Sequence, residues 1–160
     1  MRPIKFRAWN VETKEMLPVS DLSFWVDKDG KDGLDVGIRD DENVDPLYGD
    51  PNTETIPMQF TGLLDKNDRE IYEGDILLIP DEEQEHILDD GSGPIEPFNH
   101  LSPVVFLNGG FGIDITDKGD ILDDKYWSFD LLAFALGKDW QKEVEVVGNI
   151  YESKELLGET

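Results

Sequence analysis

The sequence predicts an α+β fold that is mainly antiparallel β: a small barrel-like sheet built from hairpins, with one or two short helices and long acidic loops. Three observations favour it. Apolar and basic residues alternate near the N-terminus, a central segment reads as two strands around a polar turn, and Asn-Gly separates two later apolar runs. At 160 residues, the chain is expected to form a single domain over residues 1–160 with insertions, or one domain plus a small lobe.

The first strand is predicted near the N-terminus. Ile4, Phe6 and Ala8 are expected to face the core, because alternate side chains of a strand point to the same side. Lys5 and Arg7 are expected to face solvent. This alternation is typical of a half-buried strand.

Trp9 then falls on the outward face or begins a turn, and residues 15–19 are expected to return as the second strand of a hairpin. After an apolar patch at 21–26, the chain becomes rich in Asp and Gly and loses its periodicity. We therefore expect a long acidic loop insertion at about 27–55.

The other predicted elements are arranged around residues 58–79. This segment reads as a strand, a tight polar turn at 65–68, and a strongly apolar strand that is broken at Gly74 and Asp75. Gly74 is expected to make a bulge or bend, with Asp75 accepting backbone N–H bonds. A second acidic insertion is expected at about 80–101.

A further hairpin follows the second insertion. Residues 103–107 and 111–115 are predicted strands, and Asn108-Gly109 between them supplies the positive φ angles of a tight turn. The glycines of residues 108–112 lie between these two strands, so a hairpin turn is favoured over a nucleotide-binding loop.

The C-terminal part is expected to hold the helices. Residues 126–137 predict a helix from about Ser128 with Gly137 as its stop, and a buried strand is the alternative. Residues 143–151 read as a last strand. Ser153 is a candidate cap for a short terminal helix.

Charge is the most unusual bulk property of the chain. Its 37 acidic residues exceed its 14 basic residues and give a net charge of −23. This charge argues against direct binding to nucleic acid or to anionic membranes. The absence of cysteine excludes disulfides and thiolate metal sites. With no apolar run of about 20 residues and no secretory signal, a cytoplasmic location is expected.

Three sequence blocks together carry a family resemblance. They read IKFRAW at residues 4–9, MQFTGLLDKNDREIYEGDI at 58–76 and EVVGNIYE at 145–152. They resemble the YopX-like proteins of phages and prophages, in the same order and over nearly the full length. The resemblance implies a small, strand-rich, phage-type protein of unassigned function, and it supplies no catalytic residues.

One position departs from the family pattern. Asp68 stands where the family's turn commonly has Gly. Because Asp tolerates the left-handed conformation less well than Gly, this turn is expected to be longer or of another type.

Two acidic segments are candidate metal sites. Residues 27–33 look like the start of a calcium loop, but Lys31 and Ile38 occupy positions that need oxygen ligands, so a solvated turn is favoured. A second cluster could present one helical face to a metal. It contains a single imidazole, which favours a solvated face. The cluster comprises Glu82, Glu83, Glu85, His86, Asp89 and Asp90.

Other chemistry is weakly supported. His86 and His100 are the only imidazoles and both fall in predicted loops, so no hydrolytic triad is indicated. Tyr72, Glu73 and Asp75 form a possible carboxylate site, for which a structural bend is the favoured interpretation. Trp9, Tyr72 and Tyr151 are expected to be core or interface residues. We therefore assign no catalytic, cofactor-binding or metal residues.

These observations favour a non-enzymatic accessory protein that binds an unidentified protein partner. One alternative is an acidic mimic of nucleic acid that inhibits a host DNA- or RNA-binding protein. A metal-dependent hydrolase using loop carboxylates ranks last, since nothing ties the acids to basic residues. Unpaired edge strands also allow a homo-oligomer.

Overall fold

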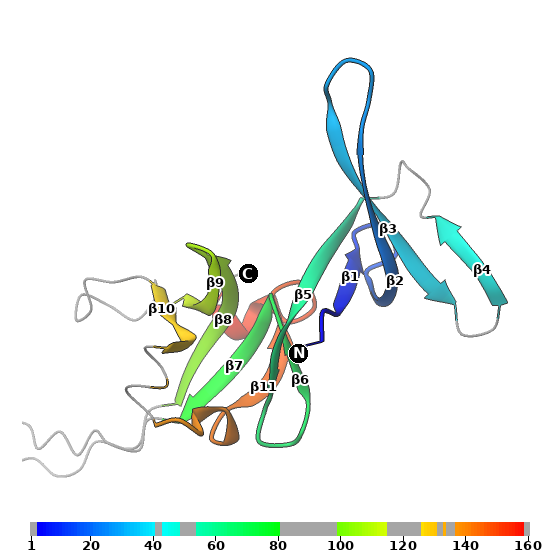
Figure 1. Ribbon diagram of the computed structural model, residues 1–160. Coiled ribbons are helices and arrows are strands. Elements are labelled where there is room, and N and C mark those ends of the chain that lie inside the picture. Colours follow the sequence, from blue (N-terminus) through cyan, green and yellow to red (C-terminus); the bar gives the residue numbers. More distant parts are fainter. Residues whose placement is uncertain are drawn as a thin grey trace, which may run out of the picture. The chain divides into compact units, whose positions relative to one another are not determined.

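The computed structural model describes residues 3–40, 43–48, 54–80, 99–114, 126–130, 133 and 137–158. The chain divides into two compact units, residues 1–62 and 63–160, and the boundary falls within strand β5 (Thr55–Leu64). Figure 1 shows the described strands of both units. No helix in the described part of the chain is long and apolar enough to cross a membrane.

The first unit is built from antiparallel strands. Its sheet has the order β4-β3-β2-β1-β5 and continues to the short strand β6 (Glu70–Tyr72). The remaining strands of this unit are β1 (Phe6–Asn10), β2 (Glu15–Val26), β3 (Asp32–Asp40) and β4 (Asn43–Tyr48).

The predicted N-terminal hairpin is confirmed. β1 pairs with β2 in antiparallel register, with Trp9 opposite Met16. The Oδ1 atom of Asn10 accepts hydrogen bonds from the backbone N–H groups of Glu12 and Thr13, both at 3.0 Å. This local bonding shapes the turn that returns the chain into β2.

The predicted facing of the first strand is wrong in two places. Ile4 precedes β1 and is 79% exposed, whereas Trp9 is buried rather than outward. Ala8, Trp9 and Asn10 are buried in succession, so both faces of the strand are covered there. Alternation identifies an inner face only where one face of the strand meets water.

The predicted acidic loop at 27–55 contains two strands, β3 and β4, and this prediction is corrected. β3 pairs with β2, and Leu34 lies opposite Phe24 while Val36 lies opposite Leu22. The apolar Leu34 and Val36 do alternate with non-apolar neighbours. These neighbours are Asp and Gly, which are depleted in strands. Pairing with β2 outweighs this weak local propensity.

The second unit contains a five-stranded antiparallel sheet of order β10-β9-β8-β7-β11. Two short 3-10 helices, η1 (Trp140–Lys142) and η2 (Lys154–Leu157), accompany it in the described residues. Its strands are β7 (Asp75–Pro80), β8 (Asn99–Leu107), β9 (Gly110–Asp114), β10 (Tyr126–Ser128) and β11 (Glu145–Asn149).

The predicted fold class is confirmed only in its coarser form. The described residues form two mainly antiparallel sheets with very little helix and no closed barrel, so the α+β and barrel-like parts are not confirmed. In the predicted helix at 126–137, the first three residues are strand β10, and Phe129, Asp130 and Ala133 are helical. Gly137 has φ +95°, which fits a helix stop.

Two further predictions concern the ends of elements. Ser153 does precede a short terminal helix, η2, but its side chain makes no capping hydrogen bond. The predicted insertion at 80–101 lies mostly outside the described residues. Its described ends are strand, because β7 reaches Pro80 and β8 begins at Asn99.

The Asn-Gly hairpin is confirmed. Leu107 of β8 pairs with Gly110 of β9, and the two residues between them have φ angles of +54° at Asn108 and +81° at Gly109. Positive φ at both positions is the requirement of a two-residue type I′ turn. The turn sequence therefore sets the register of these strands.

Replacing Gly109 by alanine is expected to lower the free energy of unfolding by about 1 kcal/mol, because a Cβ atom is disfavoured at positive φ. Nothing lies within 4 Å of the added Cβ, so crowding does not contribute. Gly110→Ala is the matched control, since this position is equally open and its φ is not positive. Urea denaturation measures both variants. If they lost equal stability, the positive φ of Gly109 would not be the cause of the loss.

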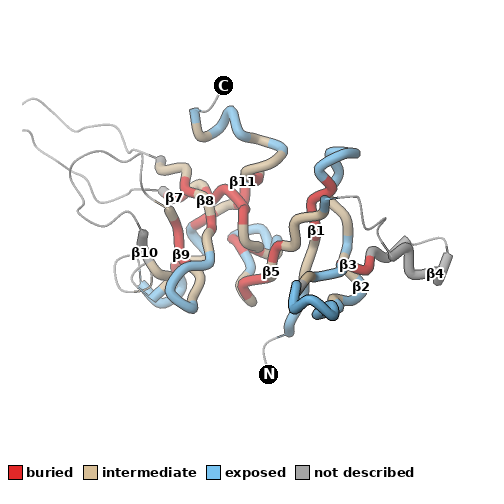
Figure 2. Tube along the Cα trace, turned by 90° about the horizontal axis from the view of Figure 1, so that it is seen from above, coloured by how far each residue is buried: buried red, intermediate tan, exposed pale blue. Residues whose placement is uncertain are grey.

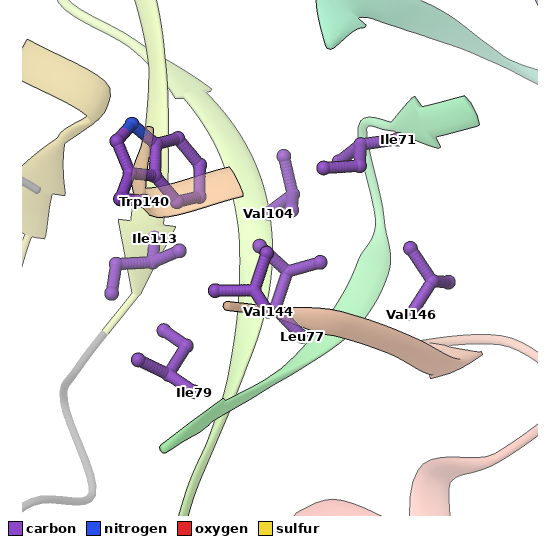
Figure 3. Packing of buried hydrophobic residues seen from close by; sticks show 8 residues of the cluster. All are labelled: Ile71, Leu77, Ile79, Val104, Ile113, Trp140, Val144 and Val146. Carbon is purple, nitrogen blue, oxygen red and sulfur yellow. The ribbon is translucent and has the colours of Figure 1, made fainter. Parts of the chain in front are cut away.

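Buried side chains of β6, β7, β8, β9, η1 and residues 144–146 form the hydrophobic core of the second unit (Figure 3). Buried residues concentrate on β7, β8 and β11 (Figure 2). Trp140 of η1 packs on Phe129 with ring centroids 4.9 Å apart. Eight buried side chains form the cluster: Ile71, Leu77, Ile79, Val104, Ile113, Trp140, Val144 and Val146.

Candidate functional site

Two of the sequence blocks meet in the second unit. We call residues 65–75 together with residues 144–152 the turn junction. The backbone N–H of Lys66 donates to the carbonyl of Val144 at 3.0 Å, and that of Ile150 donates to the carbonyl of Gly74 at 2.9 Å. Strand β11 also pairs with β7 along this junction. Segments distant in the sequence are thus held together by backbone bonds.

Asp65 is the most highly connected side chain of the junction. Its Oδ1 atom accepts hydrogen bonds from the N–H groups of Asn67 at 2.8 Å and Arg69 at 2.9 Å. Its Oδ2 atom accepts the N–H of Val146 at 2.9 Å. Asp65 is 4% exposed, so it links the turn to β11 from a buried position.

This environment favours the ionised carboxylate. Burial acts to raise the pKa of Asp65, but the N–H groups of Val146, Arg69 and Asn67 and the charge of the Arg69 guanidinium act in the opposite direction. The result is a pKa below the ordinary value of 3.8. Asp65 is therefore ionised at neutral pH and stabilises the fold in that form.

The turn that begins at Asp65 stays tight. Asp68 adopts the left-handed conformation itself, with φ +61°, and its N–H donates to the carbonyl of Asp65 at 3.0 Å. The expectation is a longer turn or a turn of another type. The longer turn is wrong, since the hydrogen bond from Asp68 to Asp65 closes a turn of four residues. The bonds to the Asp65 carboxylate help to hold this conformation.

The turn also covers the outer edge of β11. The carbonyl of Val146 accepts a hydrogen bond from Arg69 Nη1 at 3.1 Å, while its N–H is bound by Asp65. Lys66 Nζ lies 2.6 Å from Glu145 Oε2 on the same edge. A sheet edge whose backbone groups are bonded in this way cannot pair with another strand at these residues.

The predicted bend at Gly74 is confirmed. Gly74 has φ +78°, and its N–H donates to the carbonyl of Val104 at 2.8 Å. Asp75 is completely buried, and its Oδ2 atom accepts the N–H of Tyr72 at 2.8 Å. The bend separates β6 from β7, which belong to different sheets. Asp75 therefore supports the backbone, as its favoured interpretation predicted.

Asn149 plays a similar part at the end of β11. Its Oδ1 atom accepts the N–H groups of Tyr151 and Glu152, each at 3.0 Å, and its Nδ2 atom donates to Glu152. Asn149 is buried, as is Asp65. Sequence reasoning named neither as a site residue. Their signal was present, because Asp and Asn often bond the backbone two residues later.

Each of the two tyrosines named from the sequence lies near an acid of the turn junction. The hydroxyl of Tyr72 donates to Glu70 Oε2 at 2.7 Å. Burial raises the pKa of Tyr151, and the negative charge of the nearby Glu73 raises it further. Both tyrosines are half-buried. A phenol kept neutral in this way can donate a hydrogen bond to a ligand or partner.

Of the remaining candidates, one forms a turn and another lies outside the residues that the structure describes. The Oδ1 atom of Asp27 accepts the N–H groups of Asp29 at 2.8 Å and Lys31 at 2.9 Å, so residues 27–31 form the exposed turn of the β2–β3 hairpin. This confirms the solvated turn. The acidic cluster at 82–90, with His86, lies outside the described residues.

His100 was expected in a loop, and this is corrected: it lies in β8, opposite Ile79 of β7. The apolar strand β7 pairs with this segment and extends β8 to Asn99. In the described ranges, no three His, Asp or Glu side chains are grouped so that they could hold a metal ion.

Comparison with known proteins identifies relatives over nearly the whole chain. A family model described as "YopX protein" matches residues 5–158. Protein EF1440 from Enterococcus faecalis is similar in structure, with 24% identity, a TM-score of 0.52, and coverage of 98% of this chain and 99% of its own. Protein yopX from Bacillus subtilis has 19% identity, a TM-score of 0.51, and 98% coverage of each chain.

At these identities the two structures establish a shared fold and nothing about activity. None of the curated proteins matches the chain.

Proposed function

This chain belongs to the YopX protein family, and we propose that it works as a non-enzymatic accessory protein of phage type that binds another protein. One observation carries the proposal: large apolar side chains stand in water on two hairpins. Phe24 is 79% exposed and Val26 71% exposed on the β2–β3 hairpin. Phe106 and Leu107 are about half exposed beside the Asn-Gly turn.

Single exposed apolar residues are common on proteins, but neighbouring ones are typical of interaction sites. Burying a side chain such as Phe or Val contributes about 1.5–3 kcal/mol, so each hairpin offers free energy that a partner surface can use.

The turn junction supports the same proposal. Asp65 and Asp75 are buried, and both accept backbone N–H bonds. Acids used in this way stabilise turns, whereas a catalytic acid has to reach its substrate. The half-buried Tyr72 and Tyr151 add amphipathic surface of a kind that is enriched at protein interfaces.

The test is a pull-down of the tagged full chain from host lysate treated with nuclease. We expect the wild type to capture a defined protein that a Phe24→Ser/Phe106→Ser double variant does not capture. Both side chains are substantially exposed, so the variant is expected to keep the fold, which far-UV circular dichroism checks.

Three outcomes separate the possible functions. Capture that added DNA competes away would favour the nucleic-acid mimic over the present proposal. Equal capture by the wild type and the double variant would show that the exposed apolar residues are not the binding surface. No specific capture would count against a protein-binding function.

A further inference from the structure

We propose that the apolar face of the β2–β3 hairpin, defined by Phe24, Val26 and Leu34, is the docking surface for a basic protein partner. The inference rests on the proposed binding function and specifies both its surface and the chemistry of the partner.

The outer part of this hairpin is a two-stranded ribbon. Among the described residues, β1 pairs with β2 as far as Pro18, and β4 pairs with β3 from Gly37 onward. Between these limits, residues 21–26 pair with residues 32–37. The ribbon extends beyond β1 in Figure 1. Isolated two-stranded ribbons are marginally stable in water, and a partner that covers one face stabilises them.

The apolar residues of the ribbon share one face. Phe24 lies opposite Leu34 in the register, and Val26 is two positions beyond Phe24. Residues two apart in a strand point to the same side, and directly opposite residues do so as well. The same face begins at Val36, which is buried, and becomes exposed at Leu34, Phe24 and Val26. An apolar surface therefore continues from the core out to the tip.

The negative charge of the hairpin and of the whole chain favours a basic partner. Residues 21–36 contain five aspartates and two lysines, which is a net charge of −3, and the whole chain carries −23. A second copy of this chain would bring the same charge to the interface, whereas a basic protein would be attracted over a long range. The surface fits a partner that presents an apolar patch surrounded by Lys and Arg.

Phe24 is expected to be the energetic centre of the contact. It is the largest side chain of this exposed face, and aromatic anchors carry much of the binding energy at protein interfaces. Leu34 directly across the ribbon and Val26 beside it would exclude water around the anchor.

The experiment titrates the full chain with three labelled 18-residue helical peptides and follows fluorescence anisotropy. The peptides carry Leu and Lys, Leu and Glu, or Ser and Lys in the same pattern. We expect the Leu/Lys peptide to bind at least about tenfold more tightly than the other two, because only it offers both apolar contact and positive charge.

The variants locate the binding site. Phe24→Ser/Val26→Thr is expected to weaken binding of the Leu/Lys peptide by about tenfold or more, while Phe24→Leu keeps most of the affinity. The matched control is Ile4→Thr, which changes an apolar side chain that is 79% exposed and lies outside the ribbon, and it is expected to leave the affinity unchanged. Circular dichroism verifies that each variant is folded.

Several results would overturn the inference. If the control variant lost binding and Phe24→Ser/Val26→Thr did not, the surface would be wrong while the proposed function stood. If the Leu/Glu peptide bound as tightly as the Leu/Lys peptide, the basic partner would be wrong. Failure of all three peptides would reject this docking surface, and the lysate pull-down would still test the proposed function by itself.

Discussion

Replacing Trp140 with alanine is expected to lower the free energy of unfolding of the second unit by about 3–5 kcal/mol. Trp140 is 3% exposed, stands within the eight-residue core cluster and packs against Phe129. Alanine would leave a cavity between η1 and the sheet, because the strands around it are held by their own hydrogen bonds. Such a loss is a large part of the total stability of a domain.

Urea denaturation followed by far-UV circular dichroism measures this loss without depending on the fluorescence of the removed indole. Hydrogen exchange then shows whether protection falls in residues 63–160. Phe106→Ala is the matched control, because it removes a ring that is 48% exposed, and about 1 kcal/mol or less is expected. A loss below about 1 kcal/mol for Trp140→Ala would mean that Trp140 does not hold this core together.

The elements predicted correctly from the sequence are those whose cause is local. Asn108-Gly109 specifies its hairpin because both residues accept positive φ. Gly74 and Asp75 predict a bend because one supplies an unusual φ and the other bonds the nearby Tyr72 N–H. In each case the physical reason lies within a few residues, where a single sequence displays it.

The errors arise where a distant partner decides the outcome. Strand β3 forms because β2 supplies the pairing that its Asp- and Gly-rich sequence does not favour alone. Trp9 is buried although its position in the alternation pointed outward, because neighbouring elements cover both faces of β1. The Asp65 link to Val146 joins positions 81 residues apart, and no local pattern in the sequence indicates that pairing.

Replacing Asp65 with asparagine is expected to cost about 3 kcal/mol of unfolding free energy at pH 7. The change keeps the size of the side chain but leaves one oxygen to serve the N–H groups of Asn67, Arg69 and Val146. The new amide NH₂ would face at least one of these donors. A buried donor without an acceptor loses its full desolvation free energy, so the connection between the turn and β11 is weakened.

The same turn offers a control of matching chemistry. Asp68→Asn also converts an acid to an amide, but Asp68 is exposed and has φ +61°. Asparagine tolerates that conformation at least as well as aspartate, so its effect is expected to lie within about 0.5 kcal/mol of zero. Equal losses for the two variants would show that removal of a negative charge, rather than the bonding of Asp65, is responsible.

The pH dependence of the free energy of unfolding distinguishes the effect of the Asp65 charge from the effect of its shape. Its folded pKa lies below the ordinary value of 3.8, so its ionised form stabilises the fold above that pH. The stabilisation is lost as the pH falls through the folded pKa, where the carboxylate takes up a proton. The difference in unfolding free energy between wild type and Asp65→Asn should therefore be full at pH 7 and shrink below about pH 4. A difference that stayed constant to pH 3 would mean that the variant acts through packing, and that the buried carboxylate does not hold the turn junction by its charge.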